Sequence, residues 1–407
     1  MARVSVFVGD ASRVDRQALP GVAFLETHSC LTAYVRAEAL GRRHVANLYD
    51  TRWWSGSHGL PPRAPGEVDP YRPFTLDYFA YPPPFLLAML PLVPLDGDYA
   101  AQRALWFGLN AMLFAVGLGV VARWTDGPHG HRTWLLAPLL FGSLPMLVTL
   151  QVGNFQIAVV VLAVLAMVAF DSERPRTGGA LLAFAALSKL SPAVLGLVLL
   201  AQRRWRHAAY TAGFGALFVA LSALATGTDP LVSFVRYALP RIRSGEAFAF
   251  LDDDLFSVFT NLSPFGVPFK LQLLGVHVAD PWSAARRIGH GYAAALVIFL
   301  GFTMRSAAPD RGTRAVTWMS LLVLASLQSP FAPGYVSMGA LWAITLLATE
   351  VRRLRGAATL ALAWVGIAAF VHFRDVRMLG VESLVQSALV VVVPGTLVLR
   401  AARRRAA

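Results

Sequence analysis

Residues 71–85, YRPFTLDYFAYPPPF, separate two chemically different parts of the chain. The segment combines one carboxylate, Asp77, with five aromatic side chains after Tyr71 and the stiff triplet Pro82–Pro84. Before it the sequence is polar and irregular, and after it apolar runs dominate. A carboxylate on a rigid aromatic platform at the entrance to apolar segments indicates a site at the bilayer surface, where a lipid-borne substrate could be met.

The composition is that of an integral membrane protein. Of the 407 residues 56% are hydrophobic and 14% charged, and the mean hydropathy is +0.55, whereas a soluble domain carries roughly 25% charged residues. The formal net charge of +13 does not indicate nucleic-acid binding, because the arginines lie in short clusters between apolar runs. Cys30 is the single cysteine, so neither a disulfide framework nor a cysteine-based metal site is expected.

The apolar runs predict an all-α polytopic membrane protein, a bundle of about 10 to 12 membrane segments. The run at 85–95 is short and broken by Pro91 and Pro94, so it is expected to lie in the interface or insert partway. The other runs predict spans at about 100–122, 133–150, 154–170, 178–201, 207–226, 290–304, 314–328, 333–349, 356–373 and 381–399.

The basic clusters predict the orientation of these spans. We place all of them on the cytoplasmic side, following the positive-inside rule. This placement is consistent only if residues 178–201 enter and leave on the same side, with a break before Pro192, which disrupts a helix. The clusters lie at 123–132, 174–176, 203–206, 305–314, 352–355 and 400–405. The connections expected to face outward are 151–154, 227–289, 329–333 and 374–379.

The chain is expected to have four parts. They are an extracytoplasmic N-terminal segment at 1–83, a membrane core at 84–226, an extracytoplasmic loop with interfacial helices at 227–289, and C-terminal membrane helices at 290–407. Residues 1–83 contain no apolar run of the roughly 20 residues that cross a bilayer. An outward-facing segment needs an anchor before it, so the first membrane helix is expected to be missing. The alternative is a cytoplasmic N-terminal segment, with 84–98 serving as a poor span.

Three stretches occur in an order and at spacings that resemble a known family. The first is Asn47-Leu-Tyr49-Asp50 followed by Phe79-Ala-Tyr81-Pro82-Pro83, and the second is Gln151-Val-Gly153-Asn154-Phe-Gln156. The third runs from Gly178-Gly179 through Ser188-Lys189-Leu-Ser-Pro192 to Arg203-Arg204. Together they resemble GT-C class glycosyltransferases, in particular glycosyltransferase family 87, which includes PimE-like alpha-mannosyltransferases. Beyond about residue 226 the resemblance is limited to the helix pattern and Asn261-Leu-Ser263.

The resemblance implies a GT-C-like helical bundle and a membrane glycosyltransferase. Such an enzyme moves a sugar, here expected to be mannose, from a polyprenyl-phosphate donor to a glycolipid or glycan acceptor outside the bacterial plasma membrane. The donor-site motifs would then lie in the membrane core, and the implied partners are a polyprenyl-phosphate sugar donor, a glycolipid or glycan acceptor and the lipid bilayer. The alternative is a non-catalytic membrane binder or transporter of lipid-linked sugars.

An inverting transfer of this kind needs a general base, and a positioned carboxylate suits that role. The resemblance implies that an Asp in an Asp-Leu-x-Val-Tyr motif serves as the base, but here Cys30 stands in its place. The remaining candidates are Glu26, Asp50 and Asp77. If the stretch is helical, Glu26 shares a helix face with Cys30; otherwise it is a solvated residue. Asp50 can instead cap a local turn, and Asp77 can be a turn carboxylate.

Lys189 provides the strongest single-residue argument for a donor site. An ionisable group inside an apolar hairpin is costly and usually functional, and its ammonium can meet a donor phosphate as a point charge. Snorkelling or pairing with a buried acid is the alternative. Further donor-site candidates, which can equally satisfy one another or cap helices, are Gln151, Asn154, Gln156, Tyr81, His28 and Asn261.

A divalent metal is not expected from the sequence. Asp252–Asp254 offers hard oxygen ligands, but adjacent carboxylates rarely all face one ion, and acids are common at helix N-termini. The nine histidines show no metal-ligand spacing. His290 is expected to be interfacial.

Overall fold

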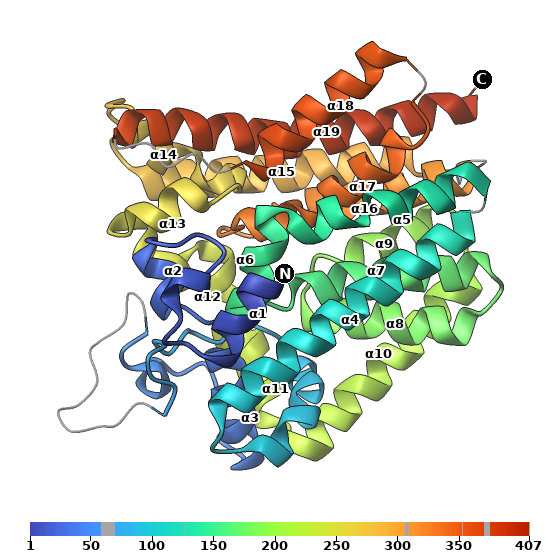
Figure 1. Cartoon of the computed structure of the whole chain (residues 1–407). Coiled ribbons are helices and arrows are strands. Elements are labelled where there is room, and N and C mark those ends of the chain that lie inside the picture. The colour runs from blue at the N-terminus through green and yellow to red at the C-terminus, as the bar shows by residue number, and fades with distance from the viewer. Residues whose placement is uncertain are drawn as a thin grey trace.

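The computed structural model describes residues 1–57, 70–125, 127–305, 308, 310–351, 353–369 and 375–406. Within these ranges every regular element is a helix, which confirms the all-α class. In Figure 1, α4 and α10 lie on one side of the molecule and α15 and α19 on the other, with α16 and α17 between them. The N-terminal helices α1–α3 gather at one end of this arrangement.

The N-terminal part consists of α1 (Ala2–Gly9), η1 (Val14–Arg16), α2 (Ala23–Thr27), α3 (Leu31–Arg42) and η2 (Thr51–Trp54). The helices of the following part are η3 (Pro83–Leu95), α4 (Tyr99–Thr125), α5 (Gly127–Gly142), α6 (Leu144–Val152), α7 (Gln156–Asp171), α8 (Pro175–Ser188), α9 (Ala193–Ala201) and α10 (Trp205–Thr226).

Short helices occupy the segment expected to form an outward loop. They are α11 (Asp229–Ser233), η4 (Phe234–Ala238), α12 (Leu239–Ser244), η5 (Glu246–Asp252), α13 (Leu255–Thr260), η6 (Pro264–Gly266) and α14 (Val267–Leu273). The C-terminal part contains α15 (Pro281–Thr303), α16 (Arg311–Ser326), η7 (Gly334–Ser337), α17 (Met338–Ala348), α18 (Leu354–Ala368) and α19 (Val376–Ala406).

Three helices in the described ranges are long and apolar enough to cross a membrane: α4, α10 and Val376–Arg403 of α19. The segments Arg132–Gly142 and Leu144–Val152 form a fourth candidate, bent by 61°. Pro145 in the first turn of α6 explains the break, because a residue without an N–H suits a helix start. The expected total of 10 to 12 membrane segments stays a prediction. Arg352, residues 370–373 and Arg374, which belong to predicted clusters, spans or connections, lie outside the described residues.

The predicted hairpin at 178–201 is present as α8 and α9. Its base lies at the C-terminal end of α7, because Arg204, just after α9, donates a hydrogen bond of 2.7 Å to Asp171. Its tip lies at the opposite end of α7, where Lys189 donates to Gln156, the first residue of that helix. The hairpin therefore enters and returns at the same end of the bundle. Pro192 at the start of α9 separates the two helices, as expected.

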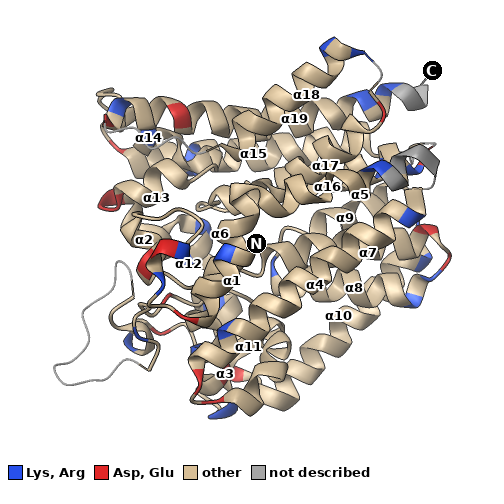
Figure 2. Cartoon of the chain, viewed as in Figure 1, with Lys and Arg blue, Asp and Glu red and all other residues tan. Residues whose placement is uncertain are grey.

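Arginines that we expected on the cytoplasmic side meet at this common end. Arg314, at the start of α16, lies 3.0 Å from the second oxygen of Asp171, which also holds Arg204. Nearby, Arg311 donates to the carbonyl of Trp124 near the end of α4, at 3.1 Å. Figure 2 shows ribbon coloured for Lys and Arg at the end of the molecule where α7 meets α8. The ends of α4, α7 and α9 and the starts of α10 and α16 thus share one basic region.

Removing the carboxylate of Asp171 is expected to destabilise this region. The Asp171 side chain is 5% exposed and neutralises two guanidinium groups that are 19% and 23% exposed. Breaking a fully buried pair costs about 3–5 kcal/mol, so we expect Asp171→Ala to cost about 2–3 kcal/mol, since both arginines retain some solvent. Thermal unfolding in detergent measures the loss. Glu246→Ala, which removes an exposed partner of Arg241, is the control, expected within about 1 kcal/mol of wild type. An equal loss of stability in Asp171→Ala and Glu246→Ala would contradict the stabilising role given to the Asp171 carboxylate.

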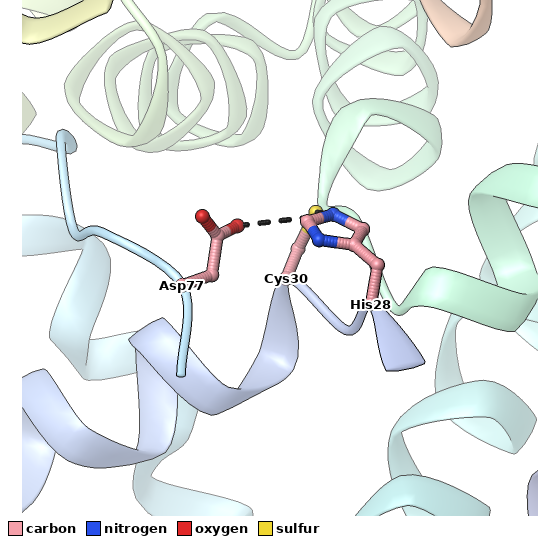
Figure 3. A group of neighbouring side chains, drawn as sticks. All are labelled: His28, Cys30 and Asp77. Carbon is pink, nitrogen blue, oxygen red and sulfur yellow. Dashed lines mark hydrogen bonds and ion pairs between the residues drawn. The ribbon is translucent and has the colours of Figure 1, made fainter. Parts of the chain in front are cut away.

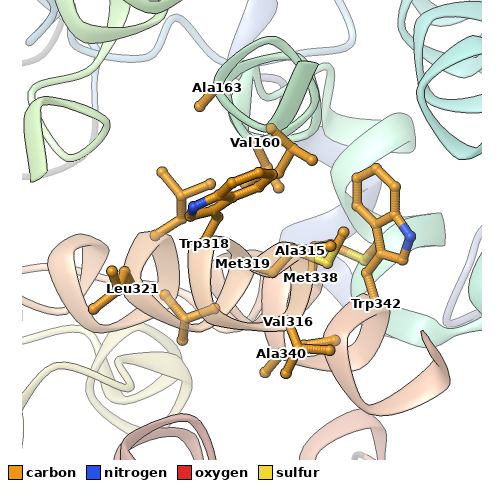
Figure 4. Packing of buried hydrophobic residues seen from close by; sticks show 14 of the residues in the cluster. Val160, Ala163, Ala315, Val316, Trp318, Met319, Leu321, Met338, Ala340 and Trp342 are labelled. Carbon is orange, nitrogen blue, oxygen red and sulfur yellow. The ribbon is translucent and has the colours of Figure 1, made fainter. Parts of the chain in front are cut away.

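The two largest hydrophobic cores among the described residues position the rest of the chain. The larger core joins α7, α16 and α17, and Figure 4 shows Val160, Trp318, Met338 and Trp342 packed within it. The second core joins the N-terminal part to η3, α4, α7 and η4. In this second core the ring of Phe85 lies 5.1 Å from that of Phe155. The segment at 71–85 is therefore attached directly to the turn between α6 and α7.

Candidate active site

A cavity of about 830 Å³ lies where the N-terminal part, the α6–α7 turn and the tip of the α8–α9 hairpin meet helices of the C-terminal half. Large apolar side chains form much of its wall, including Leu190, Val194, Leu197 and Val297. The polar side chains that line it include His28, Cys30, Asp77, Tyr81, Asn154, Gln156, Lys189, Arg243, Arg286, His290, Gln328 and Tyr335.

The ammonium of Lys189 is held by two amide side chains. Nζ donates hydrogen bonds of 3.0 Å to Asn154 Oδ1 and of 3.0 Å to Gln156 Oε1. It also lies 5.3 Å from the ring centroids of Tyr81 and Tyr335, a distance at which aromatic faces attract a cation. No ion pair to Lys189 occurs among the described residues. Dipoles therefore orient the cation and leave its charge available to an anion.

The turn between α6 and α7 explains how both amides reach Lys189. Gly153 ends α6 in the left-handed region at φ 71°, which favours glycine. A Cβ there would lie 3.2 Å from Leu31 and 3.3 Å from Trp106, so the position is also crowded. Asn154 then accepts the backbone N–H of Gln156 at 3.0 Å, which starts α7. The helix start, the amide pair and the lysine are therefore organised together.

The second polar group consists of His28, Cys30 and Asp77 (Figure 3). His28 Nε2 lies 3.4 Å from Cys30 Sγ and 3.9 Å from Asp77 Oδ2, and the three ligand-type atoms all lie within 4.8 Å of one another. Asn154 Nδ2 donates to Cys30 Sγ at 3.3 Å, which links this group to Lys189. Burial raises the pKa of the Cys30 thiol, so at neutral pH Cys30 is not a base and Asp77 supplies the carboxylate of the group.

Backbone contacts between two segments position His28 and Asp77. The N–H of Thr75 donates to the carbonyl of Thr27 at 2.8 Å, and His28 and Thr75 form a parallel bridge. The backbone N–H of Asp77 donates to Thr32 Oγ1 at 2.9 Å. Asp77 Oδ1 accepts the N–H of Tyr78 at 2.8 Å, so Oδ2 is the oxygen nearer to His28 (Figure 3).

The other two candidate bases lie elsewhere. Helix α2 ends at Thr27 and His28 has extended backbone, so the stretch is not one helix, and the condition under which Glu26 and Cys30 would share a helix face is not met. Asp50 caps η2, where it accepts the N–H of Arg52 at 3.1 Å and pairs with its guanidinium at 3.2 Å. Of the three carboxylates only Asp77 is among the residues that line the cavity described above.

Two of the expected donor-site amides, Gln151 and Asn261, are not among the residues that line the cavity and instead bind backbone groups. Gln151 accepts the N–H of Ala18 at 2.6 Å and donates to the carbonyl of Leu25 at 3.0 Å. Asn261 donates to the carbonyl of Pro330 at 2.9 Å and accepts the N–H of Ala332 at 2.9 Å. Both side chains therefore connect distant segments through backbone groups, and their role in sugar binding stays a prediction.

The two glutamines of this turn are expected to respond differently to replacement. Gln151→Ala leaves two backbone groups of the N-terminal part unpaired, so we expect a loss of about 1–3 kcal/mol in unfolding free energy. Gln156→Ala removes an acceptor of the Lys189 ammonium in the cavity, so we expect weaker anion binding and a smaller stability loss. Thermal unfolding and equilibrium binding of a polyprenyl phosphate measure the two effects. The same stability loss in both variants would contradict this division.

The structure also places residues in the cavity that sequence reasoning missed. Tyr335 faces Lys189, and Ser326 accepts a hydrogen bond from Gln156 Nε2 at 3.4 Å. Both residues flank the outward connection expected at 329–333, which is the signal that could have found them. His290, expected to be interfacial, lines the cavity with Arg286 of the same helix.

Apolar helices of membrane length and a cavity lined by an ordered cation and a carboxylate define an integral membrane protein with an internal site. The chain belongs to glycosyltransferase family 87, whose family model matches residues 79–330, more than half of the sequence. The protein is therefore a membrane glycosyltransferase. No curated protein and no solved structure gives a significant match. The matched region includes Tyr81, Asn154, Gln156 and Lys189 and begins just after Asp77.

Proposed function

We propose that this protein is a GT-C enzyme that transfers mannose from a polyprenyl-phosphate donor to a glycolipid or glycan acceptor outside a bacterial plasma membrane. The observation that carries the proposal is that Asp77 and Lys189 line one cavity. Such a transfer requires a carboxylate that accepts a proton from the acceptor and a cation that binds the donor phosphate.

The surroundings of Lys189 suit a lipid-linked phosphate. Its ammonium is a compact charge that can bind a phosphate oxygen, and two amides already hold it in place. Leu190, Val194 and Leu197, which follow it in the hairpin, line the same cavity. These apolar side chains provide a path for the first isoprene units next to the phosphate. A nucleotide donor would leave this apolar wall without a partner.

The proposed reaction is a single displacement. Asp77 Oδ2 accepts the proton of the acceptor hydroxyl while that oxygen forms a bond to the anomeric carbon of the sugar. The bond from this carbon to the phosphate oxygen breaks, and the electron pair leaves with polyprenyl phosphate, whose added charge the Lys189 ammonium stabilises. The backbone N–H of Tyr78 orients that carboxylate by donating to Oδ1, and His28 lies beside Oδ2 at 3.9 Å. The anomeric configuration inverts because the acceptor enters opposite the leaving group.

The proposed extracytoplasmic location follows from the two ends of α7. The amide group of the site lies at its first residue, Gln156, and the basic region lies at its last, Asp171. Because basic ends of membrane helices face the cytoplasm, the opposite end with the cavity faces outward. A flipped lipid-linked donor presents its sugar on that side.

A transfer assay tests the proposed function. The purified full chain, reconstituted in bilayers, is supplied with polyprenyl-phosphomannose labelled in the sugar and with a glycolipid acceptor. We expect labelled glycolipid and polyprenyl phosphate to form in equal amounts. Donor binding by the folded protein without transfer to any glycolipid or glycan acceptor would contradict the proposal and favour a binder or transporter.

A further inference from the structure

The group of His28, Cys30 and Asp77 has a second chemical property that base catalysis does not use. It combines an imidazole nitrogen, a sulfur and a carboxylate oxygen, each a ligand type that Zn²⁺ binds in proteins. Among the described residues it is the one cluster of at least three such side chains that could hold a metal ion. We propose that these three residues form a Zn²⁺ site that opens on the cavity.

The distances suit a tetrahedral ion. With metal–ligand bonds of about 2.0–2.3 Å, tetrahedral geometry separates neighbouring ligand atoms by about 3.4–3.6 Å. Here Nε2 and Sγ are 3.4 Å apart and Nε2 and Oδ2 are 3.9 Å apart. Three protein ligands leave one position open, as in catalytic zinc sites, and all three residues line the cavity from which an ion, water or substrate would reach that position.

The surrounding contacts hold the ligand atoms in place. The ring of Phe24 stacks on that of His28 at 4.4 Å, and Asn154 Nδ2 donates to Cys30 Sγ at 3.3 Å. Asp77 Oδ1 is held by the backbone N–H of Tyr78, which leaves Oδ2 for a metal. Outer contacts of this kind orient metal ligands and strengthen binding.

Charge and softness favour Zn²⁺ over the cations common in sugar transfer. A thiolate ligand selects Zn²⁺ over Mg²⁺, Ca²⁺ and Mn²⁺, which prefer oxygen. Binding displaces the thiol proton of Cys30 to solvent, so one thiolate and one carboxylate cancel the charge of the ion. The neutral site then tolerates the Lys189 ammonium, which Asn154 separates from Cys30.

The three carboxylates at 252–254 do not form a group of candidate metal ligands like that of His28, Cys30 and Asp77. Asp254 caps α13 through the N–H groups of Phe256 and Ser257, each at 3.1 Å. Asp252 instead accepts the indole N–H of Trp282. The carboxylates of Asp252 and Asp254 thus bind different partners. The group of candidate metal ligands is His28, Cys30 and Asp77 in the cavity.

A consequence for activity rests on the proposed function. A Zn²⁺ ion on Asp77 Oδ2 occupies the oxygen that would accept the acceptor proton. Metal binding and base catalysis then exclude each other, and Zn²⁺ inhibits transfer. The site would make the enzyme sensitive to zinc in the extracytoplasmic space.

Metal titration of the full chain in detergent tests the site without reference to activity. We expect Co²⁺ to give a thiolate-to-metal charge-transfer band, and one equivalent of Zn²⁺ to abolish it. Cys30→Ser is expected to lose the band, and His28→Gln to weaken Zn²⁺ binding at least tenfold. His290→Gln, a histidine of the same cavity, is the control and is expected to bind as wild type. Absence of the band in folded wild-type protein, or equal weakening by His290→Gln, would overturn the site.

The inhibitory role is tested separately. The transfer rate of each protein is measured with added Zn²⁺ and is divided by the rate of the same protein with a metal chelator. We expect micromolar Zn²⁺ to suppress wild-type transfer reversibly and to suppress Cys30→Ser at least tenfold less effectively. If Zn²⁺ binds but sugar transfer is unchanged or increased, the proposed inhibition is wrong, and the proposed metal site is still supported. A protein that binds Zn²⁺ but transfers no sugar under any condition would overturn the proposed function and the inhibition, and the site would stand.

Discussion

Replacing Asp77 by Asn is expected to lower kcat for sugar transfer by a factor of about 10²–10⁴. The amide has the size of the carboxylate and retains an oxygen that accepts the N–H of Tyr78, so the local fold is expected to persist. It cannot accept the proton of the acceptor hydroxyl. Donor affinity is expected to stay within a few-fold of wild type, because Lys189 and its amides are unchanged. Steady-state kinetics and equilibrium donor binding together measure both effects.

The matched controls for this replacement are Asp50→Asn and Glu26→Gln. Asp50 caps a short helix and pairs with Arg52, and Glu26 does not line the cavity. Both variants are expected to retain kcat within about threefold, because neither carboxylate touches the reacting atoms. A large kcat loss in either control, together with an active Asp77→Asn variant, would assign the base to another residue.

Replacing Lys189 by Met is expected to weaken donor binding about 10- to 100-fold, since a hydrogen bond to a charged group contributes about 1.5–3 kcal/mol. The rate kcat is expected to fall as well, because the leaving phosphate loses its cation. Lys189→Arg is not expected to restore activity fully. A planar guanidinium fork cannot occupy the point between Asn154 Oδ1 and Gln156 Oε1 in the way that an ammonium does.

The second lysine of the chain provides a control for loss of an ammonium. Lys270 in α14 is fully buried and donates to Ser387 Oγ at 2.6 Å, and it is not among the residues that line the cavity. Lys270→Met is therefore expected to change stability and to leave the donor Kd near wild type. An equal loss of donor binding in both methionine variants would show that Lys189 acts through the fold.

The hairpin and its lysine were predictable because their signals are local. Pro192 breaks a helix, the flanking arginines mark one side of the membrane, and Lys189 is conspicuous between apolar neighbours. The family resemblance was likewise confirmed at the level of glycosyltransferase family 87. The total number of membrane segments was not predictable to the same degree. Helices such as α7 and α16 are 16 residues long, so apolar composition alone does not show that they cross.

The choice among equivalent side chains was not predictable, because it depends on contacts between distant segments. Gln151 and Gln156 belong to one motif, but Gln151 meets Ala18 and Leu25 while Gln156 meets Lys189. Asp77 reaches the cavity because the segment that carries it pairs with Thr27. The same backbone pairing brings His28 and Cys30 close to Asp77. The three residues come from two distant segments, so no spacing in the sequence could indicate a metal site.

A structure of the protein with a bound polyprenyl-phosphate sugar tests the central claim most directly. The account predicts a phosphate oxygen within hydrogen-bonding distance of Lys189 Nζ, the isoprene chain along Leu190 and Val194, and the sugar between that phosphate and Asp77. A phosphate bound at Arg286 and His290, with the sugar remote from Asp77, would contradict it.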